Sequence, residues 1–246
     1  MSGTPREAVI GLSANVLLVG LIVGVLGFGI GAGALDGSGA AFSFVMAVWV
    51  LGLCVHAFGH ALAARRWGLP GTEALTLDPR RLPNRVATLL LPVVLTVLAG
   101  FGFPGGVSDA ATEPDPGRRS ATALAGPAMS LAFLLLLAAL YALARPEAET
   151  LRAVLAVSVL FQGTALILGL MPVPGLDGYD ILRPWLPNAW AWTERMARHS
   201  GFVLLGLFLV SSAFSRPLFG ASLRLTAALA IDLSDVIAGY RLIRLW

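Results

Sequence analysis

The feature that most constrains this chain is a pair of histidines, His56 and His60, inside a long apolar segment. Residues four apart share one face of an α-helix, about 6 Å apart along its axis, so both imidazoles can reach one metal ion. The pattern is that of an H-E-x-x-H helix, in which the Glu takes a proton from the attacking water. Ala57 stands at the position of that Glu. The sequence therefore predicts a metal site that lacks its general base.

The composition predicts that the chain lies in a membrane. Hydrophobic residues make up 57% of the 246 positions, charged residues make up 13%, and the mean hydropathy is +0.82. Such a chain cannot form the polar shell of a soluble domain, so we expect an all-α polytopic membrane protein in contact with membrane lipid. Most arginines flank apolar segments, where they indicate topology rather than phosphate binding. We expect no nucleic-acid partner and no soluble cofactor.

Apolar stretches recur along the whole chain, and each is compared with the ~20 residues that cross a bilayer core. They lie at 8–33, 41–64, 86–103, 120–144, 151–171, 201–215 and 218–240. Pro92 interrupts the 86–103 stretch, and arginines flank both of its sides, which favours a segment that enters and leaves by the same face. We therefore expect about six transmembrane helices, with a re-entrant or β-like membrane-associated segment between the second and third spans.

The arginines also predict the orientation of the chain in the membrane. With the N-terminus inside, thirteen of the 17 arginines lie on the cytoplasmic side and four lie outside, as the positive-inside rule requires. We therefore expect an integral, multi-pass protein with cytoplasmic N- and C-termini. If the 86–103 segment instead spans the membrane, the predicted orientation of every later segment is reversed.

A third metal ligand is expected from the segment that follows the apolar stretch 151–171. Two prolines end that stretch, and Asp177 follows them at membrane depth. A carboxylate within a membrane is costly and indicates function, here as the partner of His56 and His60. Two imidazoles, one carboxylate and one water make a typical open catalytic zinc sphere. Asp180, three residues further on, is the competing carboxylate.

Several separate motifs resemble those of the site-2 proteases, zinc metalloproteases that cut transmembrane substrates within the bilayer. The motifs follow one another in the same order as in that family. The first are the histidine helix at 55–64, Leu-Thr-Leu-Asp-Pro at 75–79 and Thr-Leu-Leu-Leu-Pro at 88–92. They are followed by Pro-Gly-Gly-Val at 104–107, Ala-Gly-Pro-Ala-Met-Ser at 125–130 and Pro-Val-Pro-Gly-Leu-Asp-Gly at 172–178. The resemblance implies one membrane-embedded metalloprotease domain over residues 1–246, of the compact bacterial type and without a regulatory module. Its three-helix catalytic core would cover about 41–187, with an N-terminal helix at 8–33 and C-terminal helices at 200–240.

The resemblance also implies an activity and a set of site residues. The activity is hydrolysis of peptide bonds in transmembrane segments of substrate proteins, for regulated intramembrane proteolysis in a bacterial plasma membrane. The cofactor would be Zn2+, held by His56, His60 and Asp177. Residues expected to bind substrate are Gly105, Gly106 and Val107, which could pair with an extended segment by strand addition, and Ser130 and Gly169.

Three positions depart from the family pattern. Gly169 and Ser130 stand where many members carry Asn, and Ser130 keeps a hydrogen-bonding side chain. Ala57 removes the general base, so we expect zinc binding with hydrolysis lowered by several orders of magnitude. A designed Glu-to-Ala substitution explains the otherwise intact motif most economically, and a natural pseudoprotease is the alternative. A zinc-dependent membrane binding or transport protein also stays open, although the chain lacks the internal repeat common in transporters.

The remaining reactive or polar residues are expected to be structural. Cys54 lies among apolar neighbours, which indicates a buried thiol rather than a metal ligand. His199 lies beside an arginine near a predicted interface, which indicates a solvated residue. Asp232 and Asp235 lie within the last apolar stretch, where we expect them to make hydrogen bonds between helices.

Overall fold

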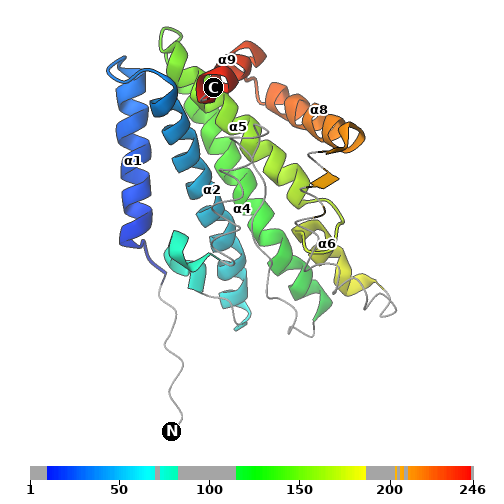
Figure 1. Ribbon diagram of the computed structural model, residues 1–246. Helices are drawn as coiled ribbons and strands as arrows, with labels where there is room; N and C mark the ends of the chain where they lie inside the picture. Colours follow the sequence, from blue (N-terminus) through cyan, green and yellow to red (C-terminus); the bar gives the residue numbers. More distant parts are fainter. Residues whose placement is uncertain are drawn as a thin grey trace.

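The computed structural model describes residues 10–69, 73–82, 115–186 and 211–244, together with Val203, Gly206, Leu207 and Val210. Within these residues the chain is helical and contains no strand. The α-helices are α1 (Ala14–Gly31), α2 (Ser38–Arg66), α4 (Pro116–Leu143), α5 (Glu149–Gly169), α6 (Asp177–Leu182), α8 (Ser212–Ala228) and α9 (Leu233–Ile243) (Figure 1). Short 3-10 helices are η1 (Glu73–Thr76), η2 (Pro79–Arg81) and η4 (Arg183–Trp185).

Four of the described helices, α1, α2, α4 and α5, are long and apolar enough to cross a membrane. They coincide, to within two turns at each end, with four of the apolar stretches predicted from the sequence. The all-α membrane class is therefore confirmed for the described residues. The 86–103 stretch and part of the 201–215 stretch lie outside the described residues, so the count of six spans and the re-entrant segment stay predictions.

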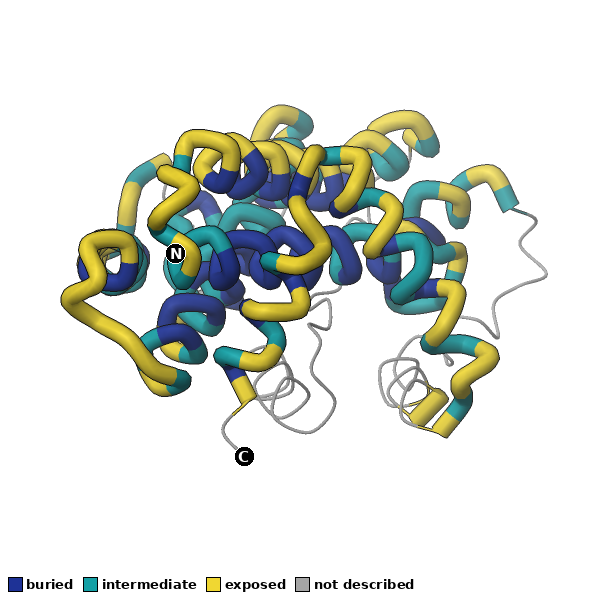
Figure 2. The backbone as a smooth tube through the Cα atoms, turned by 90° about the horizontal axis from the view of Figure 1, so that it is seen from above, coloured by how far each residue is buried: buried dark blue, intermediate teal, exposed yellow. Residues whose placement is uncertain are grey.

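Helix α5 forms the centre of the bundle. It packs against α2 and α4 and also against α8 and α9, and every residue from Ala153 to Thr164 is buried. A helix that is apolar on nearly all sides lies in a protein core or in a membrane, and α5 is enclosed by other helices of the bundle. Figure 2 shows the buried segments in the middle of the bundle and the exposed ones around its edge. Helix α1 packs mainly on α2 and exposes large apolar side chains, as a lipid-facing helix does.

Polar residues in the connecting segments explain where three helices begin. The side chains of Ser13 and Asp115 accept hydrogen bonds from backbone N–H groups in the first turns of α1 and α4. Pro116, the first residue of α4, has no N–H to leave unpaired at that end. Asp232 caps α9 by accepting from the Ser234 N–H. Such caps satisfy donors that a helix leaves free at its start.

The apolar stretch at 218–240 is not one helix, contrary to the sequence-based expectation. Helix α8 ends at Ala228, the chain turns at Leu229 and Ala230, where φ is +58° at Ala230, and α9 begins at Leu233. Helix α9 has 11 residues, so it is about 16 Å long and shorter than a bilayer core of ~30 Å. The sidedness of both termini stays a prediction, and α9 lies at the opposite end of the bundle from the start of α1 (Figure 1).

A polar cluster fastens α9 to α4 and α5. The Tyr141 hydroxyl donates to Asp235 Oδ2 at 2.6 Å, and Arg152 Nη2 lies 3.1 Å from the same oxygen. The Asp232 backbone N–H donates to the Tyr141 oxygen at 3.1 Å. Asp235 is therefore a hydrogen-bond partner between helices, as predicted. The Asp232 side chain instead caps its own helix.

Replacing Asp235 by alanine is expected to lower the free energy of unfolding by about 1–3 kcal/mol, because Arg152 and Tyr141 would lose a charged hydrogen-bond partner. Thermal or denaturant unfolding in detergent measures the change. Glu147→Ala is the matched control, since Glu147 is exposed in the connection between α4 and α5 and its loss removes the same charge. Equal stability of the two variants would show that the polar cluster does not hold α9.

Candidate metal centre

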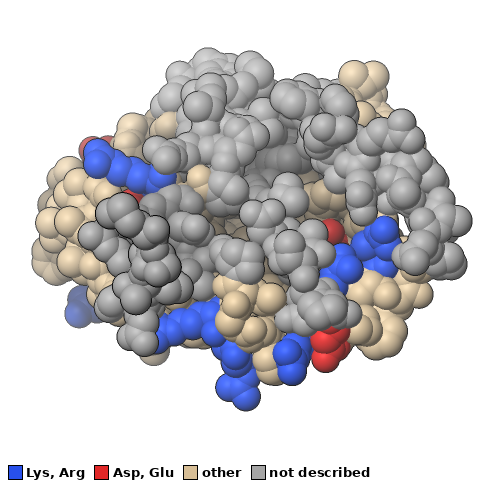
Figure 3. All heavy atoms as spheres, turned by 90° about the horizontal axis from the view of Figure 1, so that it is seen from below, with Lys and Arg blue, Asp and Glu red and all other residues tan. Residues whose placement is uncertain are grey.

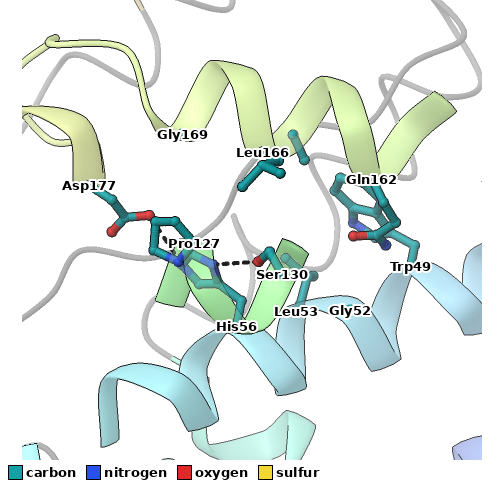
Figure 4. A pocket seen from close by; sticks show the side chains of 11 residues that line it. Trp49, Gly52, Leu53, His56, Pro127, Ser130, Gln162, Leu166, Gly169 and Asp177 are labelled. Atoms are coloured by element: carbon teal, nitrogen blue, oxygen red, sulfur yellow. Dashed lines mark hydrogen bonds and ion pairs between the residues drawn. The ribbon is translucent and has the colours of Figure 1, made fainter. Parts of the chain in front are cut away.

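The structure brings together the three residues predicted to bind a metal. His56 and His60 lie one turn apart on α2, and Asp177 is the first residue of α6. His56 Nε2 lies 3.3 Å from Asp177 Oδ2, His60 Nε2 lies 3.2 Å from Asp177 Oδ1, and the two Nε2 atoms are 3.1 Å apart. Figure 4 shows His56 and Asp177 pointing toward one another. Within the described residues, these three side chains form the group that could hold a metal ion.

These distances fit a tetrahedral zinc ion. Zinc bonds of ~2.0–2.1 Å at tetrahedral angles place the ligand atoms about 3.3 Å apart, close to the separations in this group. Asp177 Oδ1 is buried and makes no hydrogen bond to a described residue, although His60 Nε2 lies near it. A buried carboxylate oxygen without a hydrogen bond is costly unless a cation binds it. The donor set of two imidazoles and one carboxylate therefore suits Zn2+ in both chemistry and spacing.

The other ring nitrogen of each histidine is held by α4. His60 Nδ1 lies 2.8 Å from the Thr122 carbonyl oxygen, and His56 Nδ1 lies 2.9 Å from the Ser130 hydroxyl. A carbonyl can only accept, so His60 Nδ1 carries a proton, and Nε2 is the ring nitrogen that faces Asp177 and could bind a metal. A hydrogen bond from the second nitrogen is the usual way in which proteins orient metal-binding histidines.

These contacts add to what the sequence predicted about α4. Ser130 was expected to contact substrate, and the structure places its hydroxyl on His56. The Thr122 carbonyl was not predicted at all, because every residue has a backbone carbonyl and its direction has no sequence signature. The only signal nearby is the Ala-Gly-Pro motif, which begins three residues after Thr122.

Two glycines explain why α2 and α4 come so close at the site. A Cβ atom on Gly126 would overlap the imidazole ring of His60 at Nε2. A Cβ atom on Gly59 would overlap the backbone carbonyl of Ala125. The Gly of Ala-Gly-Pro thus leaves the volume that the His60 ring occupies, and the Gly between the two histidines lets the backbones approach.

Asp177 is positioned by the break between α5 and α6. Two prolines follow the end of α5, and a proline cannot continue a helix from inside it. A Cβ atom on Gly178 would overlap the Leu170 carbonyl, so this glycine lets α6 lie against the end of α5. The Ser120 hydroxyl donates to the Ile181 carbonyl at 2.6 Å, which ties α6 to α4. In the Leu-Asp-Gly motif, the aspartate therefore supplies the candidate metal ligand and the glycine allows the close packing that positions it.

The Asp177 carboxyl group is buried, and each of its oxygens faces one imidazole, Oδ2 facing His56 Nε2 and Oδ1 facing His60 Nε2. A carboxylate is the form that binds a cation. Asp180, the competing carboxylate, is not part of the group of converging ligand atoms.

A small pocket that is partly open to solvent adjoins the metal group. Gly169 lies in its wall, and a Cβ atom there would lie 3.7 Å from Asp177 Oδ2, so this position does adjoin the site. Among the described residues that line the pocket, the titratable side chains are His56 and Asp177. Ala57 packs at the edge of the hydrophobic core.

Two predicted features cannot be placed. Gly105, Gly106 and Val107, expected to bind substrate, lie outside the described residues, and so does His199. Cys54 is described and is buried, as predicted.

Arginines gather at the end of the bundle nearest the metal group. Arg65 and Arg66 lie in the last turn of α2, and Arg118 lies in the first turn of α4. Figure 3, the view from below, shows basic groups around this end of the molecule. The Trp67 ring centre lies 5.5 Å from the Arg66 guanidinium carbon and 5.0 Å from that of Arg118. Basic residues with a Trp are typical of the boundary between a membrane and water.

Replacing Ser130 by alanine is expected to lower zinc affinity by about 10–100-fold, the usual effect of removing the partner that orients a metal-binding histidine. Competition with a fluorescent zinc chelator measures the affinity. Ser222→Ala is the control, since Ser222 is buried in α8 and its hydroxyl donates to the Leu218 carbonyl of the same helix. If both variants bind zinc as the parent chain does, Ser130 does not orient His56.

The fold and the site define a class of protein, a helical bundle with helices of membrane-spanning length and a group of two histidines and one aspartate that could hold a metal ion. The chain is 36% identical over 213 residues to a protein of Mycolicibacterium smegmatis named "Putative zinc metalloprotease Rip2", a match that covers 83% of this chain and 81% of the relative. Proteins of the same name from Mycobacterium tuberculosis are 36% identical over 210 residues in strain H37Rv, with the same coverage, and 43% identical over 150 residues in strain Erdman, which is 59% of this chain and 58% of the relative.

The chain therefore belongs to the family of these zinc metalloproteases, and its cofactor is Zn2+. No family model matches the chain, and no solved structure does.

Proposed function

We propose that this protein is an intramembrane zinc metalloprotease of the site-2 type, which hydrolyses peptide bonds in transmembrane segments of substrate proteins for regulated intramembrane proteolysis. One observation carries the proposal, the convergence of His56, His60 and Asp177 beside a pocket among helices of membrane-spanning length. The zinc metalloprotease name of the relatives supports the reaction class. The order of the motifs in the sequence supports the site-2 type.

The depth of the metal group supports a transmembrane substrate. His56 and His60 lie within α2, one of the helices apolar enough to cross a membrane. The apolar side chains of Leu53 and Leu166 line the adjoining pocket. An intact substrate helix hides its amides in its own hydrogen bonds, so the segment to be cut must unwind locally to expose its backbone.

The residues of the site would have different roles in hydrolysis. His56, His60 and Asp177 would hold the zinc, which when bound supplies the Lewis acidity that polarises a water and a scissile carbonyl. Ser130 and the Thr122 carbonyl keep the imidazoles oriented. Apolar side chains such as Leu53 and Leu166 in the pocket wall would lower the local dielectric, which strengthens electrostatic interactions at the site.

The chain as it stands lacks a group to move the proton, and we propose that it binds zinc without hydrolysis. Ala57 cannot accept a proton, and the titratable side chains of the described pocket are those needed for the metal. A positioned general base contributes about 10²–10⁴-fold to the rate of such a reaction. A designed Glu-to-Ala substitution and a natural pseudoprotease both account for Ala57. A zinc-dependent membrane binding or transport protein would use the same three ligands without hydrolysis.

The proposed function also includes an orientation in the membrane, a loop that binds substrate and the extent of the domain. The arginine-rich end of the bundle and the N-terminus would face the cytoplasm of a bacterium, with lipid against α1. The C-terminus was also predicted to be cytoplasmic. The loop of Gly105, Gly106 and Val107 would pair with the unwound substrate as an added strand, and one domain would comprise residues 1–246.

The site of cleavage tests the proposed function. The Ala57→Glu form would be placed in liposomes with a panel of single-span membrane proteins, and mass spectrometry of the products would locate each cut. We expect cuts inside the hydrophobic segment. Cuts confined to residues outside that segment would exclude the site-2 type. A zinc-loaded Ala57→Glu form that cuts none of the panel would favour the pseudoprotease or the transport protein.

A further inference from the structure

The pocket beside the metal group extends along α2 and α5, away from the metal. Its two ends are marked by residues at matching places on both helices, Trp49 and His56 on α2 and Gln162 and Gly169 on α5. Seven residues separate the members of each pair, which is two helical turns or about 10 Å along the axis. Figure 4 shows Asp177 and His56 at one end of the pocket and Trp49 and Gln162 beside one another at the other end.

Two polar groups at that far end have no hydrogen-bond partner among the described residues. Trp49 is 3% exposed, and its indole Nε1 makes no hydrogen bond to a described residue. Gln162 is 6% exposed, and its side-chain amide makes no hydrogen bond to any described residue. Buried polar groups in proteins are almost always paired, because an unmade hydrogen bond costs the full desolvation of the group. The pair therefore points to a ligand that supplies the missing partners.

A purely structural role does not account for Gln162. Glutamine in a membrane helix commonly forms a hydrogen bond to a neighbouring helix, but the Gln162 amide makes none to α2. Instead, α2 has a glycine at the point of contact, and a Cβ atom on Gly52 would overlap the Gln162 amide. An apolar side chain of similar size would fill this place without the cost of an unpaired amide. The notch at Gly52 holds the amide beside the pocket.

We propose that Trp49 and Gln162 form a subsite for an amide group of the substrate, about three residues from the scissile bond. This inference rests on the proposed function, which places the scissile carbonyl at the metal end of the pocket. An extended chain advances about 3.3 Å per residue, so three residues cover the ~10 Å between the two ends.

The chemistry of the pair matches an amide. The indole N–H of Trp49 only donates, and it suits a carbonyl oxygen. The side chain of Gln162 both donates and accepts, so it suits the carbonyl and the N–H of one amide. The amide belongs to the unwound substrate backbone or to an Asn or Gln side chain, and the test below separates these two sources.

Ligands anchored on the zinc test this subsite without any cleavage. A tripeptide hydroxamate would bind the zinc-loaded chain through its hydroxamate and place its third residue near Trp49 and Gln162. Three such ligands are compared by isothermal titration calorimetry in detergent. The first is all-leucine, the second has Asn as the third residue counted from the hydroxamate, and the third ligand replaces the amide N–H of that residue by an ester oxygen.

We expect one of two differences in the parent chain. The Asn ligand binds about tenfold more tightly than the leucine ligand if a side-chain amide is bound, and the ester ligand binds about tenfold less tightly if the backbone amide is bound. Gln162→Leu reduces either difference to less than about threefold, and Trp49→Phe does the same for the Asn difference, because the indole N–H donates to the carbonyl oxygen of the bound amide. Ser158→Ala keeps the difference, because the Ser158 hydroxyl donates to the Val154 carbonyl of its own helix, one turn from Gln162.

Acetohydroxamate, which is too short to reach Trp49 or Gln162, separates the failure of this inference from the failure of the proposed function. If it does not bind the zinc-loaded parent chain, the zinc site is not open to a ligand, and the proposed function fails together with the subsite. If it binds but the three tripeptide ligands bind equally, the subsite is overturned and the proposed function stands. A difference that persists unchanged in both Gln162→Leu and Trp49→Phe also overturns the subsite.

Discussion

Changing Ala57 to glutamate is expected to raise the rate of peptide hydrolysis by about 10²–10⁴-fold or more. The glutamate would supply the carboxylate that takes a proton from the attacking water and passes it to the leaving amine. His56 and Asp177, the titratable side chains of the described pocket, cannot replace it while they hold zinc. The measurement is the rate of cleavage of a single-span membrane protein in liposomes, with zinc content determined in the same samples.

Ala57→Gln is the matched control for this experiment. Glutamine has nearly the size of glutamate but cannot accept the proton, so this variant should stay as inactive as the parent chain. Zinc content should be equal in all three proteins, because the residue at position 57 is not among the converging ligand atoms. Cleavage by the parent chain at the rate of the glutamate form would show that position 57 does not supply the base.

The second large effect is expected from Gly126→Ala, which adds one methyl group to α4. Its Cβ atom would overlap the His60 imidazole at Nε2, so either the ring or the whole of α4 must move. Apparent binding free energies of about 10–16 kcal/mol are typical of zinc in small structural sites, and the loss of one of three ligands removes a sizeable share of such a value. We expect zinc affinity to fall by more than about a hundredfold, measured by competition with a chelator.

Two glycines at open positions serve as controls for that substitution. Gly39 in α2 and Gly220 in α8 have no atoms within 4 Å of an added Cβ. Alanine is a better helix former than glycine by about 0.8–1.0 kcal/mol, so Gly39→Ala and Gly220→Ala should leave zinc affinity unchanged and slightly raise stability. A Gly126→Ala chain that binds zinc as tightly as these controls would contradict the contact between α4 and His60.

The three side chains of the candidate metal group could be predicted from the sequence for physical reasons that act locally. The spacing of His56 and His60 places both on one face of any helix, whatever the rest of the chain does. Asp177 could be singled out because a carboxylate in an apolar setting is costly and needs a partner. Four helices of membrane-spanning length followed from hydropathy, because the bilayer sets a minimum length for each span.

Other features of the chain were not predictable in this way. The apolar stretch that ends near residue 240 is divided between α8 and α9, because Ala230 adopts a left-handed conformation and Asp232 caps a new helix. Hydropathy averages over a window and does not register a turn of two residues within an apolar stretch. The position of Asp235 beside Arg152 and Tyr141 likewise depends on where α9 packs.

By itself, then, the sequence determined the membrane class, the three side chains that converge as a candidate metal site and the presence of Ala at position 57, since each depends on residue type and on spacing along one helix or one loop. The tertiary structure alone decided which groups surround the metal. The Thr122 carbonyl meets His60, Gly126 makes room for that ring, and Trp49 meets Gln162 at the far end of the pocket. These contacts join helices that are far apart in the chain, and they depend on how closely and at what register the helices cross, which no local pattern of residues records.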